Sequence, residues 1–282
     1  MYDSKYTKDF YNAYGEAEWD RLETGAYGRL QAIIHADFLQ RYLKSADNIL
    51  DAGSGPGRFA IKSAQIGAKV TVLDISDTQL TIAKEKITEA GVLDKIDQFL
   101  EADITDLSMF PTNYFDSVVC FGGALSYVCE RRQKAVQELL RVSRPGAIIL
   151  VSVMSRIGSC LLDVQIPNLQ VLKEPNKSTL QQPGLWQPLK TGDLYGFPSR
   201  RTKLIHAPMH LYTAEELKSL FGNTQILEIA GSNVTIRGYS PSVEQIAADP
   251  LSWETLIELE RKINTDTGLL NSGSHIILAA RK

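Results

Sequence analysis

A glycine-rich turn at residues 51–57 is the part of this sequence whose residue types could most directly do chemistry. It consists of an aspartate followed by three glycines at alternate positions, D-A-G-S-G-P-G. Glycine permits positive φ angles and lets a ligand lie directly against the backbone. One or two glycines would suffice for a tight turn, so three of them predict a bound ligand. A dinucleotide site would need its third glycine at Arg58, and a Walker loop would need Gly-Lys-Ser/Thr.

Two further carboxylates stand at the ends of predicted strands. Asp74 ends the run K-V-T-V-L-D, and Asp103 follows I-D-Q-F-L-E-A. An ionised carboxylate only accepts hydrogen bonds, so it suits the hydroxyl and amino donors of a ligand. The carboxyl ends of parallel strands meet at one edge of a sheet, which is where such folds bind their ligands. The sequence therefore predicts one site built from the glycine turn and these acids.

The elements that must position these residues alternate between strand and helix. From residue 48 onward, apolar β-branched runs alternate with stretches of helical periodicity, and an Arg-Pro-Gly turn is predicted at 144–146. This pattern predicts an α/β fold with a doubly wound parallel sheet covered by helices on both faces. The predicted strands span 48–53, 69–74, 96–103, 114–123, 147–153, 224–231 and 275–282, and the predicted helices span 56–67, 76–90, 131–143, 212–221 and 249–263.

Residues 154–210 break this alternation, because they contain six prolines and no sustained period. A stretch of this length without clear elements is usually a functional insertion. We therefore predict four parts: an N-terminal helical cover (1–44), a cofactor-binding core (45–153), a substrate-cap insertion (154–210) and the C-terminal part of the core sheet with an inserted helix (211–282).

The spacing D-x-G-x-G-x-G resembles motif I of the class I S-adenosylmethionine-dependent methyltransferases. The segments F-D-S-V-V-C-F-G-G and L-L-R-V-S-R-P-G resemble the fourth- and fifth-strand motifs of the same family, so the likeness covers about residues 45–155. It implies a Rossmann-like sheet of seven strands, mostly parallel with the last strand antiparallel. It also implies that S-adenosylmethionine is the cofactor and S-adenosylhomocysteine the product.

The resemblance also implies which residues bind the cofactor. Asp51 would pair with the cofactor's ammonium group, Asp74 would accept both ribose hydroxyls and Asp103 would accept the adenine amino group. Ile75 and Ile104 would sandwich the adenine ring. The other candidates lie in the glycine turn, beside the methyl group or in the N-terminal cover: Ala52, Gly53, Ser54, Gly55, Gly57, Phe121, Gly122, Tyr11 and Tyr14.

The segment after the fourth strand narrows the class of acceptor. It is Phe121-Gly122-Gly123-Ala124, whereas enzymes that methylate planar amino groups resemble one another in an (N/D)-P-P-(Y/F) motif. Cys120 lies inside an apolar strand, where a small core residue is expected and not a nucleophile. No carboxylates cluster in this segment to hold a metal. The net charge of −3 also argues against a duplex-binding face. We therefore expect a small-molecule acceptor, methylated at O or N, with no metal and no nucleic-acid partner.

Two of the four histidines are candidates for a general base. His206 and His210 precede the helix predicted at 212–221, which should bring them to the ligand edge of the sheet. His35 and His275 are predicted to be packed, structural residues. The alternative is that alignment alone drives the methyl transfer, which then needs no base.

Other features bear on the setting of the protein. No apolar run reaches the roughly 18 residues that span a membrane. The first residues lack the pattern of a secretory signal. The three cysteines do not have the number or spacing of a disulfide framework. We expect a cytoplasmic monomer or homodimer with no membrane partner. Three alternatives stay open: an NAD(P)-dependent oxidoreductase, which would also use Asp74, a non-catalytic cofactor-binding module, and an RNA or protein methyltransferase with a basic or extended groove.

Overall fold

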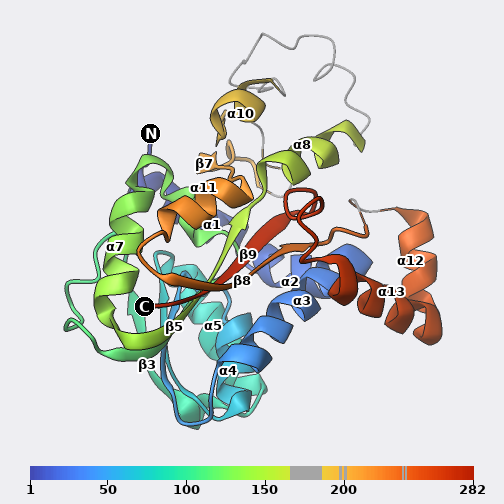
Figure 1. Ribbon diagram of the computed structural model, residues 1–282. Coiled ribbons are helices and arrows are strands. Elements are labelled where there is room, and N and C mark those ends of the chain that lie inside the picture. Colours follow the sequence, from blue (N-terminus) through green and yellow to red (C-terminus); the bar gives the residue numbers. More distant parts are fainter. Residues whose placement is uncertain (166–185, 197–198, 200–201, 237, 239) are drawn as a thin grey trace.

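A seven-stranded sheet forms the centre of the computed structural model, which describes residues 1–165, 186–196, 199, 202–236, 238 and 240–282 (Figure 1). Its strands are β1 (Asn48–Ala52), β2 (Lys69–Asp74), β3 (Ile96–Glu101), β4 (Phe115–Cys120), β5 (Ser143–Met154), β8 (Gln225–Ser232) and β9 (His275–Arg281). They are arranged in the order β3-β2-β1-β4-β5-β9-β8, parallel from β3 to β5, and β9 runs antiparallel to both β5 and β8. The predicted doubly wound sheet with an antiparallel last strand is confirmed.

Helices cover both faces of the sheet (Figure 1). The chain begins with three helices, α1 (Ser4–Tyr14), α2 (Ala17–Glu23) and α3 (Ala26–Tyr42). The helices between and after the strands of the sheet are α4 (Arg58–Ile66), α5 (Asp77–Glu89), α6 (Ala124–Tyr127), α7 (Arg132–Val142), α11 (Ala214–Leu220), α12 (Pro241–Ala248) and α13 (Pro250–Ile263), with short 3-10 turns at Leu93–Lys95 and Cys129–Arg131.

The helix boundaries follow the capping signals in the sequence. Ser76 accepts a hydrogen bond from the Gln79 backbone and so begins α5. Thr213 and Glu216 form a capping box at the start of α11, each side chain accepting from the other's backbone N–H. These caps satisfy backbone donors that the helices themselves leave without partners. They fix where each helix begins relative to the sheet edge.

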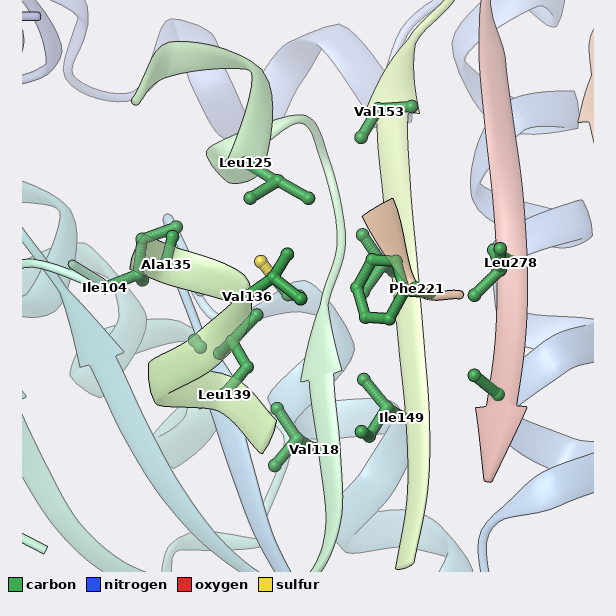
Figure 2. Close-up of a cluster of buried hydrophobic side chains, with 14 of the residues drawn as sticks. Ile104, Val118, Leu125, Ala135, Val136, Leu139, Ile149, Val153, Phe221 and Leu278 are labelled. Atoms are coloured by element: carbon green, nitrogen blue, oxygen red, sulfur yellow. The ribbon is translucent and has the colours of Figure 1, made fainter. Parts of the chain in front are cut away.

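Two apolar clusters hold the helices against the sheet. On one face, Val136 and Leu139 of α7 and Phe221, which follows α11, pack on Val118, Ile149 and Leu278 of the strands (Figure 2). On the other face, α3, α4 and α5 bury a second set of apolar side chains, which includes Ile34, Phe38, Ile61 and Ile87. Each fully buried side chain of this size contributes about 1.5–3 kcal/mol. This packing keeps the carboxyl ends of the strands at one edge.

The turn predicted at residues 144–146 proves to be a bulge within a strand. Ser143 of β5 pairs with Phe115, and the next pair joins Ile148 to Ser117. Pro145 has no backbone N–H to offer the ladder, and Gly146 has a φ of 82°. The Arg-Pro-Gly signal therefore marks an irregular start of β5 and not the end of the preceding connection.

The described part of the predicted insertion lies above the carboxyl edge of the sheet (Figure 1). Its described elements are α8 (Arg156–Gln165), α10 (Trp186–Thr191) and a two-stranded sheet of β6 (Asp193–Leu194) and β7 (Met209–His210). Residues 166–185 of the predicted insertion lie outside the described residues. Within the described part of the chain, no helix is both long and apolar enough to cross a membrane.

Candidate functional site

The glycine turn connects β1 to α4 and opens onto a cavity. The backbone N–H groups of Gly53 and Ser54 both donate to the Leu73 carbonyl, at 2.8 and 2.9 Å. A Cβ added at Gly53 would lie only 2.3 Å from Cβ of Ala124, so the turn has no room for a side chain there. A Cβ at Gly55 would meet only Cγ of Glu18, at 3.8 Å. Gly53 thus serves packing, whereas Gly55 keeps ligand space open.

This first cavity, the space in front of the glycine turn, is partly open to solvent. It brings together most of the residues that the sequence predicted for the cofactor. Those on its wall are Tyr11, Gly53, Ser54, Gly55, Asp74, Ile75, Asp103, Ile104, Phe121 and Gly122, joined by Tyr2, Thr7, Glu18, Arg21, Leu22, Pro56, Arg58, Phe59, Ala102, Ala124, Tyr127 and Val128.

Two carboxylates hold fixed positions on this wall. Asp74 accepts hydrogen bonds from the backbone N–H groups of Gly55 and Ser76, both at 2.8 Å. Burial raises the pKa of Asp74 to about 6, against the lowering effect of those two donors. Asp103 accepts from the Thr105 backbone at 2.8 Å. Each carboxylate oxygen keeps a lone pair for a ligand donor, as a ribose or an adenine amino group would require.

Four of the predicted cofactor residues are not on the wall of this cavity, and Tyr14 is one of them. Asp51 is 1% exposed and lies within β1, where it pairs with Val72 and Val119. Ala52 is fully buried in the core. A Cβ at Gly57 would lie 3.0 Å from Cβ of Ala83, so Gly57 allows α4 and α5 to pack closely. Asp51, Ala52 and Gly57 thus support the turn from behind.

Asp51 has an unusual environment for a carboxylate. One of its oxygens accepts from the Ala60 backbone, and Oδ2 has no hydrogen-bond partner. Burial, together with the nearby charge of Asp74, raises the pKa of Asp51 to about 7. The folded protein therefore holds a proton that the unfolded chain, with an ordinary pKa near 3.8, would release.

Asp51→Asn should raise the melting temperature at about pH 8 and change it little at about pH 5. Because the pKa of Asp51 is raised by folding, the free energy of unfolding falls as pH rises from about 4 to about 7. Asparagine is neutral at every pH, so the variant does not lose this stability. At about pH 8 its free energy of unfolding should exceed that of the wild type by about 1–2 kcal/mol. Scanning calorimetry of the ligand-free proteins at both pH values measures this. An equal change at both values would mean that Asp51 is ionised in the fold.

The sequence did not reveal an ion pair that projects into the cavity from α2. The Arg21 guanidinium donates to Glu18 Oε1 at 2.6 Å, and the two side chains are 20% and 14% exposed. Arg21 Nη2 also lies 3.7 Å from the position that a Cβ on Gly122 would take. A carboxylate and a guanidinium at this place match the ammonium and carboxylate groups of an amino acid. The only feature of the sequence that could have indicated this pair is the spacing of Glu18 and Arg21, three residues apart in the predicted N-terminal cover.

Arg58, which follows the last glycine, ties α2 to the turn. Its guanidinium lies 4.0 Å from the centre of the Trp19 ring and donates to the Trp19 carbonyl at 2.9 Å. It also pairs with Glu23. A cation held over an indole ring is a favourable contact when partly desolvated. Arg58 stands where a dinucleotide site would have its third glycine. In this structure it positions α2, the helix that carries Glu18 and Arg21.

Helix α1 closes over the same edge. Lys8 Nζ lies 2.6 Å from Oε1 of Glu101, at the end of β3. Asn12 donates to Asp77, at the start of α5, at 2.9 Å. These contacts lie beside the strand ends that carry Asp74 and Asp103. The helix can thus shield the cavity from water, as a closed cover would.

A second cavity adjoins the first, and Tyr11, Glu18, Arg21, Gly122 and Tyr127 line both. Its other walls come from α1, the end of β5, the start of β9 and the insertion. They are largely apolar or aromatic and consist of Phe10, Tyr14, Met154, Ser159, Leu162, Leu194, His206, Met209 and His275. Tyr14 thus faces this second cavity and not the first.

His206 lies on the wall of the second cavity. Its ring centre is 4.6 Å from that of Phe10 and 6.0 Å from that of Tyr127, nearly parallel to the latter. Nδ1 lies 2.9 Å from the Ala207 carbonyl, so Nδ1 carries the proton and Nε2 is the acceptor nitrogen. Burial lowers the pKa of His206 to about 4. The imidazole is therefore neutral near pH 7.

His210 lies elsewhere, contrary to the expectation from the sequence. It follows Met209 in β7, and successive side chains of a strand point to opposite faces. Met209 faces the second cavity, so His210 points away from it. Its Nδ1 lies 2.7 Å from Asp193 Oδ1, and Glu216 is 3.9 Å from Nε2, in a third cavity. In this structure His210 joins β7 to β6 and does not face either of the two adjoining cavities.

His275, which the sequence marked as structural, does line the second cavity. It is 3% exposed at the start of β9, with Nδ1 3.0 Å from the Ser274 hydroxyl and Nε2 3.4 Å from the Gln31 amide. Burial holds its pKa well below the ordinary value. His35 is packed as predicted, with a pKa that burial lowers to about 4. Among the described residues, no group of three or more His, Cys, Asp or Glu side chains could hold a metal ion.

Known proteins resemble this chain in sequence over its central part. Residues 50–151 match the family model described as "Methyltransferase domain". The chain is 35% identical over 118 residues to a ubiquinone/menaquinone biosynthesis C-methyltransferase UbiE of Francisella tularensis subsp. novicida. It is 31% identical over 123 residues to the protein of the same name in Ectopseudomonas mendocina. These matches cover 40% and 43% of this chain but only 45% and 46% of the relatives, so the chain spans less than half of their length.

Solved structures show the same fold across nearly the whole chain. Magnesium protoporphyrin IX methyltransferase of Synechocystis PCC 6803 has a TM-score of 0.59 at 15% identity over 99% of both chains. The [4+2]-cyclase SpnF has a TM-score of 0.53 at 21% identity over 88% of this chain and 79% of its own. At such identities the likeness establishes the fold alone. Residues 50–151 therefore match a methyltransferase domain, and the chain shares the fold of these solved structures.

Proposed function

We propose that this protein transfers the methyl group of S-adenosylmethionine to a small, uncharged aromatic acceptor that carries a hydroxyl group. The observation that carries the proposal is the pair of adjoining cavities. The first combines the glycine turn, two fixed carboxylates and an amino-acid-like ion pair. The second has aromatic walls and neutral histidines. Five residues common to both cavities mark where the methyl group would pass from one to the other.

The first cavity fits the cofactor in its chemistry. Arg21 would pair with the carboxylate of the cofactor and Glu18 with its ammonium group. Asp74 would accept from the ribose hydroxyls and Asp103 from the adenine amino group. When bound, the cofactor supplies a methyl group on a sulfonium, so the protein has mainly to align the acceptor and exclude water.

The second cavity favours a neutral, flat molecule. The charged side chains on its described wall, Glu18 and Arg21, are already paired with each other. An anionic acceptor would therefore lose its hydration without gaining a free cation, which costs several kcal/mol. The rings of Phe10, Tyr11 and Tyr127 offer faces and edges for stacking. A ring hydroxyl could donate to Nε2 of His206.

Carbon is the acceptor atom that we propose. The sequence led us to expect oxygen or nitrogen, but the relatives are named C-methyltransferases of ubiquinone and menaquinone biosynthesis. A hydroxyl that shares its proton with a base raises the electron density of the ring carbons beside it. The new C–CH₃ bond would use a π pair of the ring, and the proton on that carbon would then leave to solvent.

Incubation with ¹³C-methyl S-adenosylmethionine should methylate hydroquinone at a ring carbon. The anion 4-hydroxybenzoate should react at least about tenfold more slowly, because the cavity cannot compensate its charge. The chemical shift of the labelled methyl carbon separates carbon from oxygen products. Faster reaction of the anion, or an O-methyl product, would contradict the proposed acceptor.

The cofactor is tested separately from the acceptor, since the same fold also occurs in a protein named a [4+2]-cyclase. S-adenosylhomocysteine should raise the melting temperature and NADH should not. A shift with NADH alone would favour the oxidoreductase alternative. Binding of S-adenosylhomocysteine with no transfer to any phenol would favour the non-catalytic module.

A further inference from the structure

Tyr2 lies at the end of the first cavity that contains Asp103, the carboxylate proposed to bind the adenine amino group. Its hydroxyl donates to Asp103 Oδ2 at 2.8 Å, while Asp103 Oδ1 accepts from the Thr105 backbone at 2.8 Å. Tyr2 also lines the cavity itself. The Asp103 carboxylate thus accepts a hydrogen bond from the Tyr2 hydroxyl and also faces the space for the ligand.

We propose that Tyr2 is a cofactor-binding residue, which orients Asp103 toward the adenine amino group and closes that end of the cavity. This inference rests on the proposed function, because it concerns the same cofactor. None of the comparisons assigns a role to Tyr2, and the sequence presented it only as one of several aromatic residues near the N-terminus.

The bond to Tyr2 is compatible with a bound adenine. Each oxygen of a carboxylate can accept two hydrogen bonds, so Asp103 Oδ2 can accept from Tyr2 and from an amino group together. With one donor on each oxygen, the carboxylate cannot rotate freely, and its remaining lone pairs point in fixed directions. Burial and the charge of Asp103 raise the pKa of Tyr2, so its hydroxyl stays a donor.

Neighbouring residues hold Tyr2 in this place. Its backbone N–H donates to both carboxylate oxygens of Glu130, each at 2.9 Å. The guanidinium of Arg131 lies 5.8 Å from the centre of its ring. Both partners belong to the turn after α6, next to Val128 on the cavity wall. The residues before α1 are therefore held across the adenine end by contacts to the Tyr2 backbone and to its ring.

Tyr2→Phe should weaken binding of S-adenosylhomocysteine about tenfold and speed its dissociation, since it removes one charge-assisted hydrogen bond but keeps the ring. S-inosylhomocysteine, which has an oxygen in place of the adenine amino group, is the matched probe. Because the oxygen at that position cannot donate to Asp103, the affinity for this ligand should change less than about twofold. Calorimetry gives the affinities, and stopped-flow measurement gives the dissociation rate.

Tyr42→Phe is the matched control variant. Its hydroxyl also donates to a carboxylate, that of Glu228 at 2.7 Å, but on α3 and away from the cavity. It should melt close to Tyr2→Phe and bind both ligands as the wild type does. Unchanged or tighter binding of S-adenosylhomocysteine by Tyr2→Phe would overturn the inference, and so would equal weakening of both ligands. Failure of the wild type to bind S-adenosylhomocysteine would instead refute the proposed function.

Discussion

Gly55→Val should lose cofactor affinity by about 100-fold or more while the protein stays folded. Gly55 has a φ of 52°, and a Cβ built there enters the cavity with only Glu18 Cγ within 4 Å. The methyl groups of valine would occupy space that the amino-acid part of the cofactor needs. A β-branched residue also resists the left-handed region, at a cost of about 1–2 kcal/mol, and would pull the N–H away from Asp74. Calorimetry with S-adenosylhomocysteine measures the loss.

Gly91→Val separates backbone strain from lost ligand space. Gly91 has a φ of 70°, follows α5, and has nothing within 4 Å of an added Cβ. Its valine variant should melt lower by a similar amount, yet bind S-adenosylhomocysteine like the wild type. If both variants lost affinity equally, the effect at Gly55 would be general destabilisation. If Gly55→Val kept wild-type affinity, the glycine turn would have no role in binding the cofactor.

The cofactor half of the site could be predicted from the sequence because its signals are local. In a parallel sheet, residues at the carboxyl end of a strand are carried to the ligand edge whatever the rest of the chain does. Asp74 is the last residue of β2 and Asp103 lies two residues after β3, and both line the first cavity. Asp51 does not, because it stands inside β1, one residue before its end. Side chains within a strand point to the faces of the sheet, so Asp51 is buried beside the first turn of α4.

The acceptor half could not be predicted in the same way. Its walls come from the N-terminal helices and from an insertion whose sequence has no sustained period. Which of two nearby histidines faces the cavity depends on the two-residue strand β7, and a pairing this short leaves no alternation to detect. The Glu18–Arg21 pair resembles any exposed helical ion pair until the fold places it over the glycine turn. Tertiary contacts, and not local pattern, decide these positions.

His206→Gln should reduce turnover by about 10²- to 10⁴-fold with little change in cofactor affinity, the usual range for a lost general base. The proposed role needs Nε2 to take the proton of the acceptor hydroxyl, and the bond from Nδ1 to the Ala207 carbonyl keeps Nε2 free of a proton. Glutamine can accept a hydrogen bond but cannot hold that proton. Single-turnover rates with hydroquinone, and calorimetry with S-adenosylhomocysteine, separate the two effects.

The pH dependence of the wild type follows from the environment of His206. Since burial lowers its pKa to about 4, the imidazole is already deprotonated above about pH 5. The value of kcat/KM should therefore stay level from about pH 8 down to about pH 5 and fall only near pH 4. A base with the ordinary pKa near 6.5 would instead produce a fall between about pH 7 and pH 6. The His206→Gln variant should lack the fall near pH 4.

His210→Gln is the matched comparison, because it makes the same change four residues away. His210 points into a different cavity and contacts Asp193, so its loss should leave turnover within a few-fold of the wild type. A large loss at His210 with none at His206 would reverse the assignment. Small effects in both variants would mean that the methyl transfer depends on alignment alone. The aromatic walls would then set the rate, because they hold the acceptor carbon in line with a sulfonium that is already a strong electrophile.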